Sequence, residues 1–345
     1  MTTAEATADQ KAEPTRSAGL VDRALAAVER LPGPAEAWFV AAGCVLALIG
    51  HGVLWISGTY AFGQLNSEVI IASVLAGAFL ALSAFMKRTA DAAFEDFRPA
   101  LSDPSREEAE RQRLLAIPDR AFVVAAVAMA ILTNTLYLVL VKPTEAPRPP
   151  LAELVVAATW LFFAIVFGLV IGQTLIQLRS VRHLSEVARN IDVLNSGPVD
   201  ALSRVTAVGA VGMLVFITVA NLGVPATASA YVGLDVFVIV FALAAFLLPL
   251  QVMHRRLSRQ KADLLAASAE RLRKVLDALH RAVDSHDFTT ADGLNKMVAS
   301  AIAERDLLTR LSTWPWTSTT IRGFGSALLL PVVIFVITRS IDRLF

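Results

Sequence analysis

The sequence predicts an all-α, polytopic helical membrane protein with six transmembrane helices, a short seventh hydrophobic segment and a cytoplasmic helical hairpin. Hydrophobic residues make up 55% of the 345 residues, and charged residues make up only 18%. The charges gather in a few segments, and six runs between them approach the roughly 20 apolar residues that a membrane-crossing helix needs. Loops rich in Lys and Arg alternate with poor ones, which indicates a chain that crosses the bilayer repeatedly.

The N-terminal part precedes the membrane domain. Residues 1–18 are polar and lack an apolar pattern, so we expect them to be disordered and not to form a signal peptide. Residues 19–34 predict an amphipathic helix, with Asp22 on its polar side. This helix is either solvated or lies on the membrane surface, and Pro32 and Pro34 ahead of the first span favour the surface. Its apolar side is formed by Leu20, Val21, Leu25, Val28 and Leu31.

The membrane domain is predicted over residues 36–253. A seventh run, Gly323–Thr338, has only 16 uncharged residues between two arginines and contains Pro331. It either spans the bilayer, with the arginine side chains extended to the interfaces, or is half-inserted. The six longer runs are Trp38–Ile56, Val69–Met86, Ala121–Val141, Leu151–Leu175, Val205–Leu222 and Tyr231–Met253.

The basic residues predict the side on which each loop lies. Residues 87–120 carry seven Lys or Arg, residues 179–204 carry four, and residues 254–312 carry eleven. Residues 57–67 and 223–230 carry none. Because basic loops stay inside, we expect the N-terminus and the three basic segments to be cytoplasmic, in the cell (inner) membrane.

Two cytoplasmic loops show internal structure. Residues 87–120 predict a packed helical hairpin in which Ser105 caps a charged helix. In residues 177–204, apolar residues recur at helical spacing, so the fourth span should continue into the cytoplasm. The sixth span should likewise continue into the basic segment that follows it.

Residues 254–312 predict an antiparallel hairpin of two amphipathic helices, interrupted at His286–Thr290. A single hairpin buries little apolar area, so its stripes should contact another subunit or another protein. We therefore expect a homo-oligomer, with a cytoplasmic protein partner as an alternative. The residues expected at that interface are Leu265, Leu272, Leu276, Leu279, Val283, Leu294, Val298 and Ile302.

Polar residues near the outer ends of the spans form the candidate site. They predict a water-filled outer vestibule whose acids favour cations, with Gln173, Thr174 and Gln177 as the matching inner group. The alternative for the deeper pair, His51 and Asn134, is a set of interhelical hydrogen bonds without further function. The expected vestibule residues are His51, Glu68, Asn134, Thr135, Tyr137, Glu153, Asn221 and Asp235.

Small residues in the spans are expected to serve packing. Ser73, Gly77 and Ala81 recur every four residues in the second run, and Gly168 and Gly172 do so in the fourth. Lipid tails are as apolar as the helices, so close backbone approach must hold the bundle together.

The sequence lacks the residues that most chemical functions require. Cys44 is the only cysteine, which excludes an intrachain disulfide and a cysteine-based metal site. His280, Asp284 and His286 fit an exposed cluster beside a turn better than a metal site, and no phosphate-binding loop or nucleophile elbow is present. We expect no cofactor, no metal, no nucleic-acid partner and no enzymatic activity, with the lipid bilayer as the chief partner.

The C-terminal part, residues 313–345, carries Trp314-Pro315-Trp316, which predicts an interfacial anchor of Trp314 and Trp316. Together with Thr320–Phe324 and Ala327–Pro331, this ending resembles that of an uncharacterised family of prokaryotic multi-span membrane proteins. Phe97–Leu101 and Pro198–Thr206 are further similar blocks, so the resemblance covers the chain from about residue 40. It implies a shared fold and assigns no residue roles.

Three functions follow from these patterns. The first is an oligomeric, passive channel-like or transport protein with an outer vestibule, since the six long runs lack coupling charges near their centres. The second is a membrane scaffold or signal-coupling protein that acts through its cytoplasmic hairpin. The third is an intramembrane enzyme, for which no residue set stands out. A pore predicts a hydrated path, whereas a scaffold predicts a dry bundle and an apolar hairpin face.

Overall fold

The computed structural model describes residues 19–101, 103–141, 148–188, 194, 197–221, 230–314, 316 and 318–341. These residues form helices and no strand, as the all-α prediction requires. Three short elements are η1 (Arg98–Ala100), η2 (Pro104–Arg106) and the π-helical turn η3 (Tyr137–Val141). The α-helices are α1 (Leu20–Glu29), α2 (Ala35–Ile56), α3 (Ser67–Phe97), α4 (Glu107–Leu115), α5 (Asp119–Leu136), α6 (Pro150–Val187), α7 (Gly197–Asn221), α8 (Ala230–Leu247), α9 (Gln251–Asp284), α10 (Phe288–Arg310) and α11 (Ser318–Ile341).

Six helical segments of the described chain are long and apolar enough to cross a membrane. They correspond to α2, α3, α5, α6, α7 and the run from α8 into α9, which confirms the six predicted spans. Leu48 on α2 is 65% exposed and Val124 on α5 is 69% exposed, as suits side chains that face lipid. The protein is a multi-pass membrane protein.

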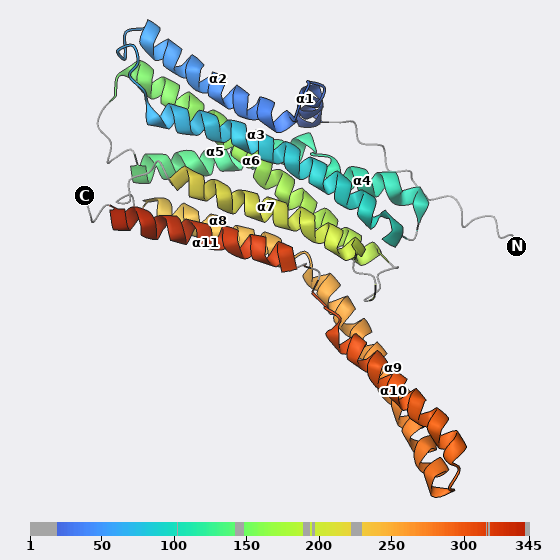
Figure 1. The fold of residues 1–345 in the computed structure, drawn as a ribbon. Helices are drawn as coiled ribbons and strands as arrows, with labels where there is room; N and C mark the ends of the chain where they lie inside the picture. The colour runs from blue at the N-terminus through green and yellow to red at the C-terminus, as the bar shows by residue number, and fades with distance from the viewer. Residues whose placement is uncertain are drawn as a thin grey trace, which may run out of the picture.

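The spans form a bundle of nearly parallel helices (Figure 1). Helix α3 packs against α2, α6 and α7, while α5 packs against α6, and α7 packs against α8 and α11. Helices α3, α6 and α7 are therefore central, and α2, α5, α8 and α11 surround them. One end of the bundle carries α1, α4 and the α9–α10 hairpin, and we call it the hairpin end (Figure 1). The basic segments gather at this end, as predicted.

Helix α11 settles the form of the seventh hydrophobic segment. It is a single helix of 24 residues with Pro331 in its interior. At 1.5 Å per residue it is about 36 Å long, and it runs along the bundle beside α7 (Figure 1). The segment is thus a continuous helix packed on the bundle, and it is not among the six described helical segments that are long and apolar enough to cross a membrane, so spanning and half-insertion both stay predictions.

Glycines set the closest helix crossings. A Cβ added at Gly77 of α3 would lie 2.6 Å from the carbonyl oxygen of Phe39 on α2. A Cβ at Gly168 of α6 would lie 2.6 Å from the Cα of Ala126 on α5. Real Cβ atoms do not approach other atoms so closely, so these crossings require glycine. The packing role predicted for the small residues is confirmed at both positions.

The segment after α3 packs onto the hairpin end, as predicted. Helix α3 continues to Phe97, and Phe94, Phe97 and Leu114 of α4 are buried with side chains of α6 and α7. The predicted capping of the charged helix by Ser105 is wrong, because α4 has Arg106 at its N-cap and no side-chain cap, and a carboxylate caps the preceding turn η2 instead. Asp103 accepts the backbone N–H of Ser105 at 3.0 Å, and Ser105 itself lies inside η2. The carboxylate occupies the capping position because Pro104 begins the turn.

Helix α1 packs against α2 and α3 through both its apolar and its polar side. Leu25 is buried in a cluster with Phe39 of α2 and Ala84 of α3. Asp22, predicted on the polar, solvent-facing side, is only 6% exposed and accepts Lys87 Nζ at 2.8 Å. That prediction was wrong because helical spacing assigns a residue to a face, whereas the neighbouring loop decides whether that face is covered.

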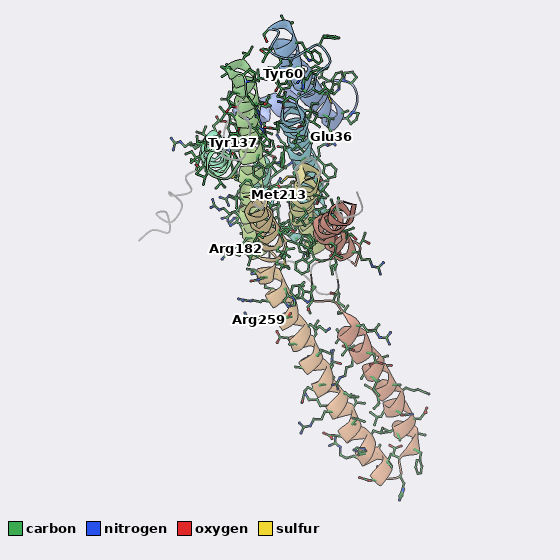
Figure 2. All side chains as sticks on the ribbon, turned by 90° about the vertical axis from the view of Figure 1, so that its left-hand side faces the viewer. Glu36, Tyr60, Tyr137, Arg182, Met213 and Arg259 are labelled. Atoms are coloured by element: carbon green, nitrogen blue, oxygen red, sulfur yellow. The ribbon has the colours of Figure 1, made fainter. Side chains whose placement is uncertain are left out.

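The two predicted continuations into the cytoplasmic region turn out differently. Helix α6 has 38 residues and runs unbroken from Pro150 to Val187, as expected. The continuation of the sixth span is interrupted, since α8 ends at Leu247 and α9 begins at Gln251. Pro249 lies in this break and supplies no N–H for a helical hydrogen bond. Helix α9 therefore leaves the bundle at an angle, and it forms with α10 the projecting hairpin that the sequence predicted (Figures 1 and 2).

Candidate functional site

His51, one of the deeper pair of the predicted vestibule, has both ring nitrogens in hydrogen bonds. It is 2% exposed, and its Nδ1 donates to the carbonyl oxygen of Ala47 at 2.7 Å. Its Nε2 accepts the backbone N–H of Asn66 at 2.9 Å. One nitrogen donates and the other accepts, so both ring nitrogens have partners and the ring fixes the start of α3. The structural alternative for His51 is therefore the one that its contacts support.

His51 makes no hydrogen bond to another described residue of the predicted vestibule, although its partner Asn66 also accepts the N–H of Glu68 at 3.0 Å. Helix α2, which carries His51, packs mainly on α3, whereas Asn134 lies on α5 and donates to the carbonyl oxygen of Ala130 in its own helix. Glu68 forms an ion pair with Arg148 that ties α3 to the segment before α6. Thr135 is exposed, Tyr137 and Glu153 are half-buried, and the side chains of Asn221 and Asp235 lie outside the described residues.

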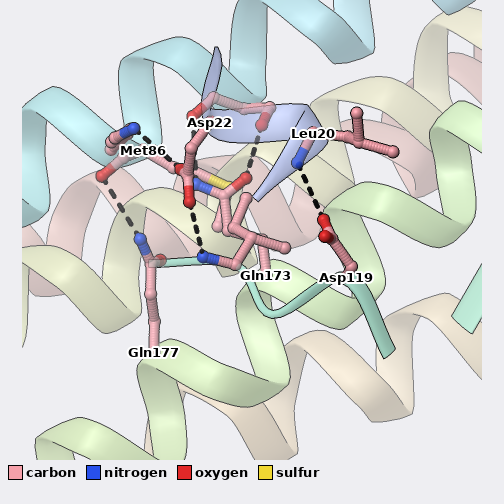
Figure 3. A network of polar contacts seen from close by, with 9 residues as sticks. Leu20, Asp22, Met86, Asp119, Gln173 and Gln177 are labelled. Carbon is pink, nitrogen blue, oxygen red and sulfur yellow. Dashed lines mark hydrogen bonds and ion pairs between the residues drawn. The ribbon is translucent and has the colours of Figure 1, made fainter. Parts of the chain in front are cut away.

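The inner polar group belongs to a buried network toward the hairpin end (Figure 3). Gln173 of α6 donates to the Ser83 carbonyl oxygen at 3.0 Å and accepts the Ser83 hydroxyl. Gln177 donates to the Met86 carbonyl oxygen at 3.5 Å. The group therefore links α6 to α3, and its amides have partners as buried polar groups require. It gives these helices a fixed register.

The same network holds the N-terminal helix in place. Besides Lys87, Asp22 accepts the backbone N–H of Ile117 at 3.2 Å. Asp119 accepts the N–H of Leu20 at 2.8 Å, at the start of α1 (Figure 3). Two carboxylates thus join α1 to α3 and to the entry of α5. Sequence spacing contained no sign of these partners, because they lie 65 to 99 residues apart.

The junction of the bundle and the hairpin has the most elaborate set of contacts, and we call it the joint. Its first part is Arg256, in the second turn of α9. The guanidinium donates to the carbonyl oxygens of Ser185 and Ala188 at 2.9 Å each, and to that of Glu186 at 3.3 Å. These carbonyls end α6 and lack partners within their helix. A positive charge is also favourable at a helix C-terminus, so Arg256 fastens α9 to α6.

The second part of the joint is a stack of aromatic rings. Ring centroids lie 3.8 Å apart for His254 and Trp314, 4.9 Å for Trp314 and Trp316, 4.8 Å for Trp316 and Phe246, and 4.0 Å for Phe246 and Phe324. The stack joins α8, α9 and α11 across the two breaks in the chain at which the hairpin leaves the bundle. Trp314 and Trp316 lie in the connection between α10 and α11, so the stack attaches this connection to the bundle.

Polar contacts close the base of the hairpin. His254 Nδ1 donates to the Thr313 carbonyl oxygen at 2.9 Å. Lys261 Nζ donates to the carbonyl oxygens of Thr309 and Leu311 at 2.7 Å each, which caps the C-terminus of α10. Both connections join α9 to the chain that returns from α10. The base of the hairpin is therefore attached to the joint by these hydrogen bonds.

Aromatic and histidine side chains at this end of the molecule have protein partners. Trp316 is 9% exposed and packed within protein, while Trp314 is 47% exposed, so of the predicted anchor pair only Trp314 keeps an exposed surface. His254 stacks on Trp314 and donates a hydrogen bond to the Thr313 carbonyl oxygen. His183 has Nε2 at 2.7 Å from Arg113 Nη1 and 3.2 Å from the buried Glu110. These residues hold helices together, and their partners were not visible in local sequence spacing.

The tip of the hairpin is a capped turn. His286 adopts a positive φ of 56° at the reversal of the chain. Asp287 is the N-cap of α10 and accepts the N–H of Thr290 at 3.1 Å. Hydrogen bonds from Thr290 and Thr289 hold the pKa of the Asp287 carboxyl below its ordinary value. His280, Asp284 and His286 are exposed beside this turn, as the preferred interpretation of this cluster predicted.

Comparisons with known proteins give no relative for this arrangement. The chain matches no protein-family model, no curated protein and no solved structure. The resemblance of its C-terminal part to an uncharacterised family stays a prediction.

Proposed function

We propose that this protein is a membrane-embedded coupling or scaffold protein that transmits the position of its spans to a projecting cytoplasmic hairpin. The observation that carries this proposal is the joint, in which Arg256 attaches α9 to the end of α6 through three carbonyl oxygens. The positive-inside rule supports a cytoplasmic location for the hairpin. The hairpin would then present its apolar face to a partner.

The geometry of the joint supports amplification of small movements. Helices pack about 10 Å apart, so a slide of about 1 Å between α6 and α8 would tilt α9 by roughly 0.1 radian. From Arg256 to the tip at Asp284, α9 extends about 40 Å at 1.5 Å per residue. The tip would therefore move by about 4 Å. Such a displacement is enough to alter a docking surface.

The interior of the described bundle supports a scaffold better than a pore. Phe79, Phe163 and Phe167 lie in one buried cluster, with ring centroids 5.2 to 6.0 Å apart. Aromatic rings thus occupy the space between α3 and α6, and His51 is committed to hydrogen bonds. The outer vestibule of a passive channel lacks comparable support among the described residues.

The proposal is tested by moving the spans and measuring the hairpin. Cys44 is replaced by Ala, and spin labels are attached at Arg179→Cys on α6 and Ser285→Cys at the tip. In nanodiscs of short-chain and long-chain phosphatidylcholine, bilayer thickness changes helix tilt. We expect the distance between the labels to differ by several ångströms between the two lipids.

Arg256→Ala should broaden the distance distribution and remove its lipid dependence. Arg255→Ala is the matched control, since this neighbouring arginine is exposed and makes no described hydrogen bond. Equal distributions for the two variants would refute a mechanical joint. Ion flux in proteoliposomes above that of empty liposomes would refute the scaffold in favour of the channel.

A further inference from the structure

The hairpin has two unlike sides, and one of them is apolar. Arg271 of α9 and Glu304 of α10 form an ion pair at 2.6 Å and define the polar side. At about 100° per residue, the apolar residues of α9 lie about 80–140° around the helix from Arg271. Those of α10 lie about 80–160° from Glu304. The two helices are antiparallel, so both rotations lead to one side of the hairpin. This apolar face consists of Leu265, Leu272, Leu276, Leu279, Val283, Leu294, Val298 and Ile302.

Small residues between the helices limit how far α10 covers the large ones. Ser268 and Ala282 of α9 are buried, at 1% and 8% exposure. They let α10 approach closely, and Leu265, Leu272, Leu276, Leu279, Leu294 and Val298 are left half-buried beside this contact. Val283 and Ile302 remain 46% and 48% exposed on the apolar face. A two-helix hairpin cannot cover this face by itself.

We infer that the apolar face binds the same face of a second copy of this chain, forming a four-helix bundle about a two-fold axis along the membrane normal. This inference rests on the proposed function, because it names the partner of the hairpin. The membrane holds all copies in one orientation, so their hairpins project side by side. A two-fold axis then places α9 of one copy against α10 of the other, antiparallel as in ordinary four-helix bundles.

The register of the hairpin makes the apolar face self-complementary. The turn at 285–287 and the Arg271–Glu304 ion pair place Leu272 level with Ile302. The same register places Leu276 level with Val298 and Leu279 level with Leu294. Each level would become one core layer of four large side chains, two from each copy. On this side Arg305 lies between the levels of Leu265 and Leu272, and Lys261 lies nearer the base.

The size of the apolar face also fits a second copy. From Leu265 to Val283 it extends about 27 Å at 1.5 Å per residue, and two helices are about 20 Å wide. The face thus covers roughly 540 Å² per chain, or about 1,100 Å² for the pair. This passes the area of about 1,000 Å² that a specific interface needs. Confinement to one membrane raises the effective concentration further.

Cysteine cross-linking tests the inference on the full-length Cys44→Ala protein in liposomes. We expect Val298→Cys on the apolar face to be linked into dimers by a short bismaleimide, and Met297→Cys to stay monomeric. Met297 is the sharper control because it is adjacent, is 55% exposed and faces the polar side, so random collision would favour it. Leu276→Glu should abolish the Val298→Cys dimer while circular dichroism shows unchanged helicity.

Several outcomes would overturn the inference. One is a Met297→Cys dimer without a Val298→Cys dimer. Another is particles of monomer mass in nanodiscs. Protection of Val298→Cys from maleimide without cross-linking in native membranes would assign the face to a different protein. When labelled protein is diluted with unlabelled protein, the spin-label experiment measures a distance within one copy and does not depend on dimerisation. The proposed function and the dimer can therefore be refuted separately.

Discussion

Replacing Gly168 by Ala tests the claim that direct backbone contact holds α5 in the bundle. The new Cβ would lie 2.6 Å from Ala126 Cα and 2.7 Å from the Ala125 carbonyl oxygen. Ordinary contact begins at 3.4 Å, so α5 and α6 must separate by 0.8 Å, the difference between 3.4 and 2.6 Å. No flexible side chain can absorb this shift, because the opposing atoms belong to the backbone.

The cost of Gly168→Ala follows from the contacts that this separation weakens. A gap of 0.5–1 Å removes about a quarter to a half of the dispersion energy of each atom pair. Taking about 50 pairs at about 0.1 kcal/mol each, as for one buried leucine, the loss is about 2 kcal/mol. Overpacking a core typically costs about 1–3 kcal/mol, in agreement. The affected contact is the main one that α5 makes among the described helices.

Thermal unfolding in detergent, followed by the loss of folded protein, provides the assay. We expect Gly168→Ala to lower Tm by roughly 4–8 °C. Gly323→Ala is the matched control, because a Cβ there meets nothing within 4 Å and alanine favours a helix by up to about 1 kcal/mol. Equal Tm values for the two variants would refute the assignment of the α5–α6 crossing to glycine.

Three further predictions concern polar groups. His51→Phe removes the acceptor of the Asn66 N–H and should destabilise the protein by about 1–3 kcal/mol. It should leave proteoliposome ion flux unchanged, and altered flux would restore the vestibule. Gln173→Leu should lower the free energy of unfolding by about 1–3 kcal/mol, because it leaves the buried Ser83 hydroxyl without its acceptor. The double variant Ser83→Ala/Gln173→Leu should lower it less, since no buried group is left unpaired. Equal losses of stability in thermal unfolding would contradict the network. Hydrogen bonds lower the folded-state pKa of Asp287, so its contribution is present above the unfolded-state pKa of about 3.9 and is lost as pH falls through the folded-state value. Amide exchange at the start of α10 should show this acid-dependent loss of protection, and Asp287→Asn should lack it.

The spans, their order and the ends at which their loops lie were determined by the sequence alone. Hydropathy and helical spacing act along one segment at a time, so they predict α2 or α6 without knowledge of a neighbour. Gly77 and Gly168 were identified for the same reason, because small residues serve packing wherever a helix meets another. The hairpin stripes, from Leu265 to Ile302, were also visible in the spacing.

The partners of polar groups were decided only by the tertiary structure. His51 was expected in a vestibule, and it bonds instead with Asn66. Asp22 was placed toward solvent, and it lies buried beside Lys87. Arg256 was one of many basic residues, and it caps α6 about 70 residues away in sequence. A hydrogen bond depends on which distant backbone atom lies within about 3 Å, and that distance is set by how the helices pack together.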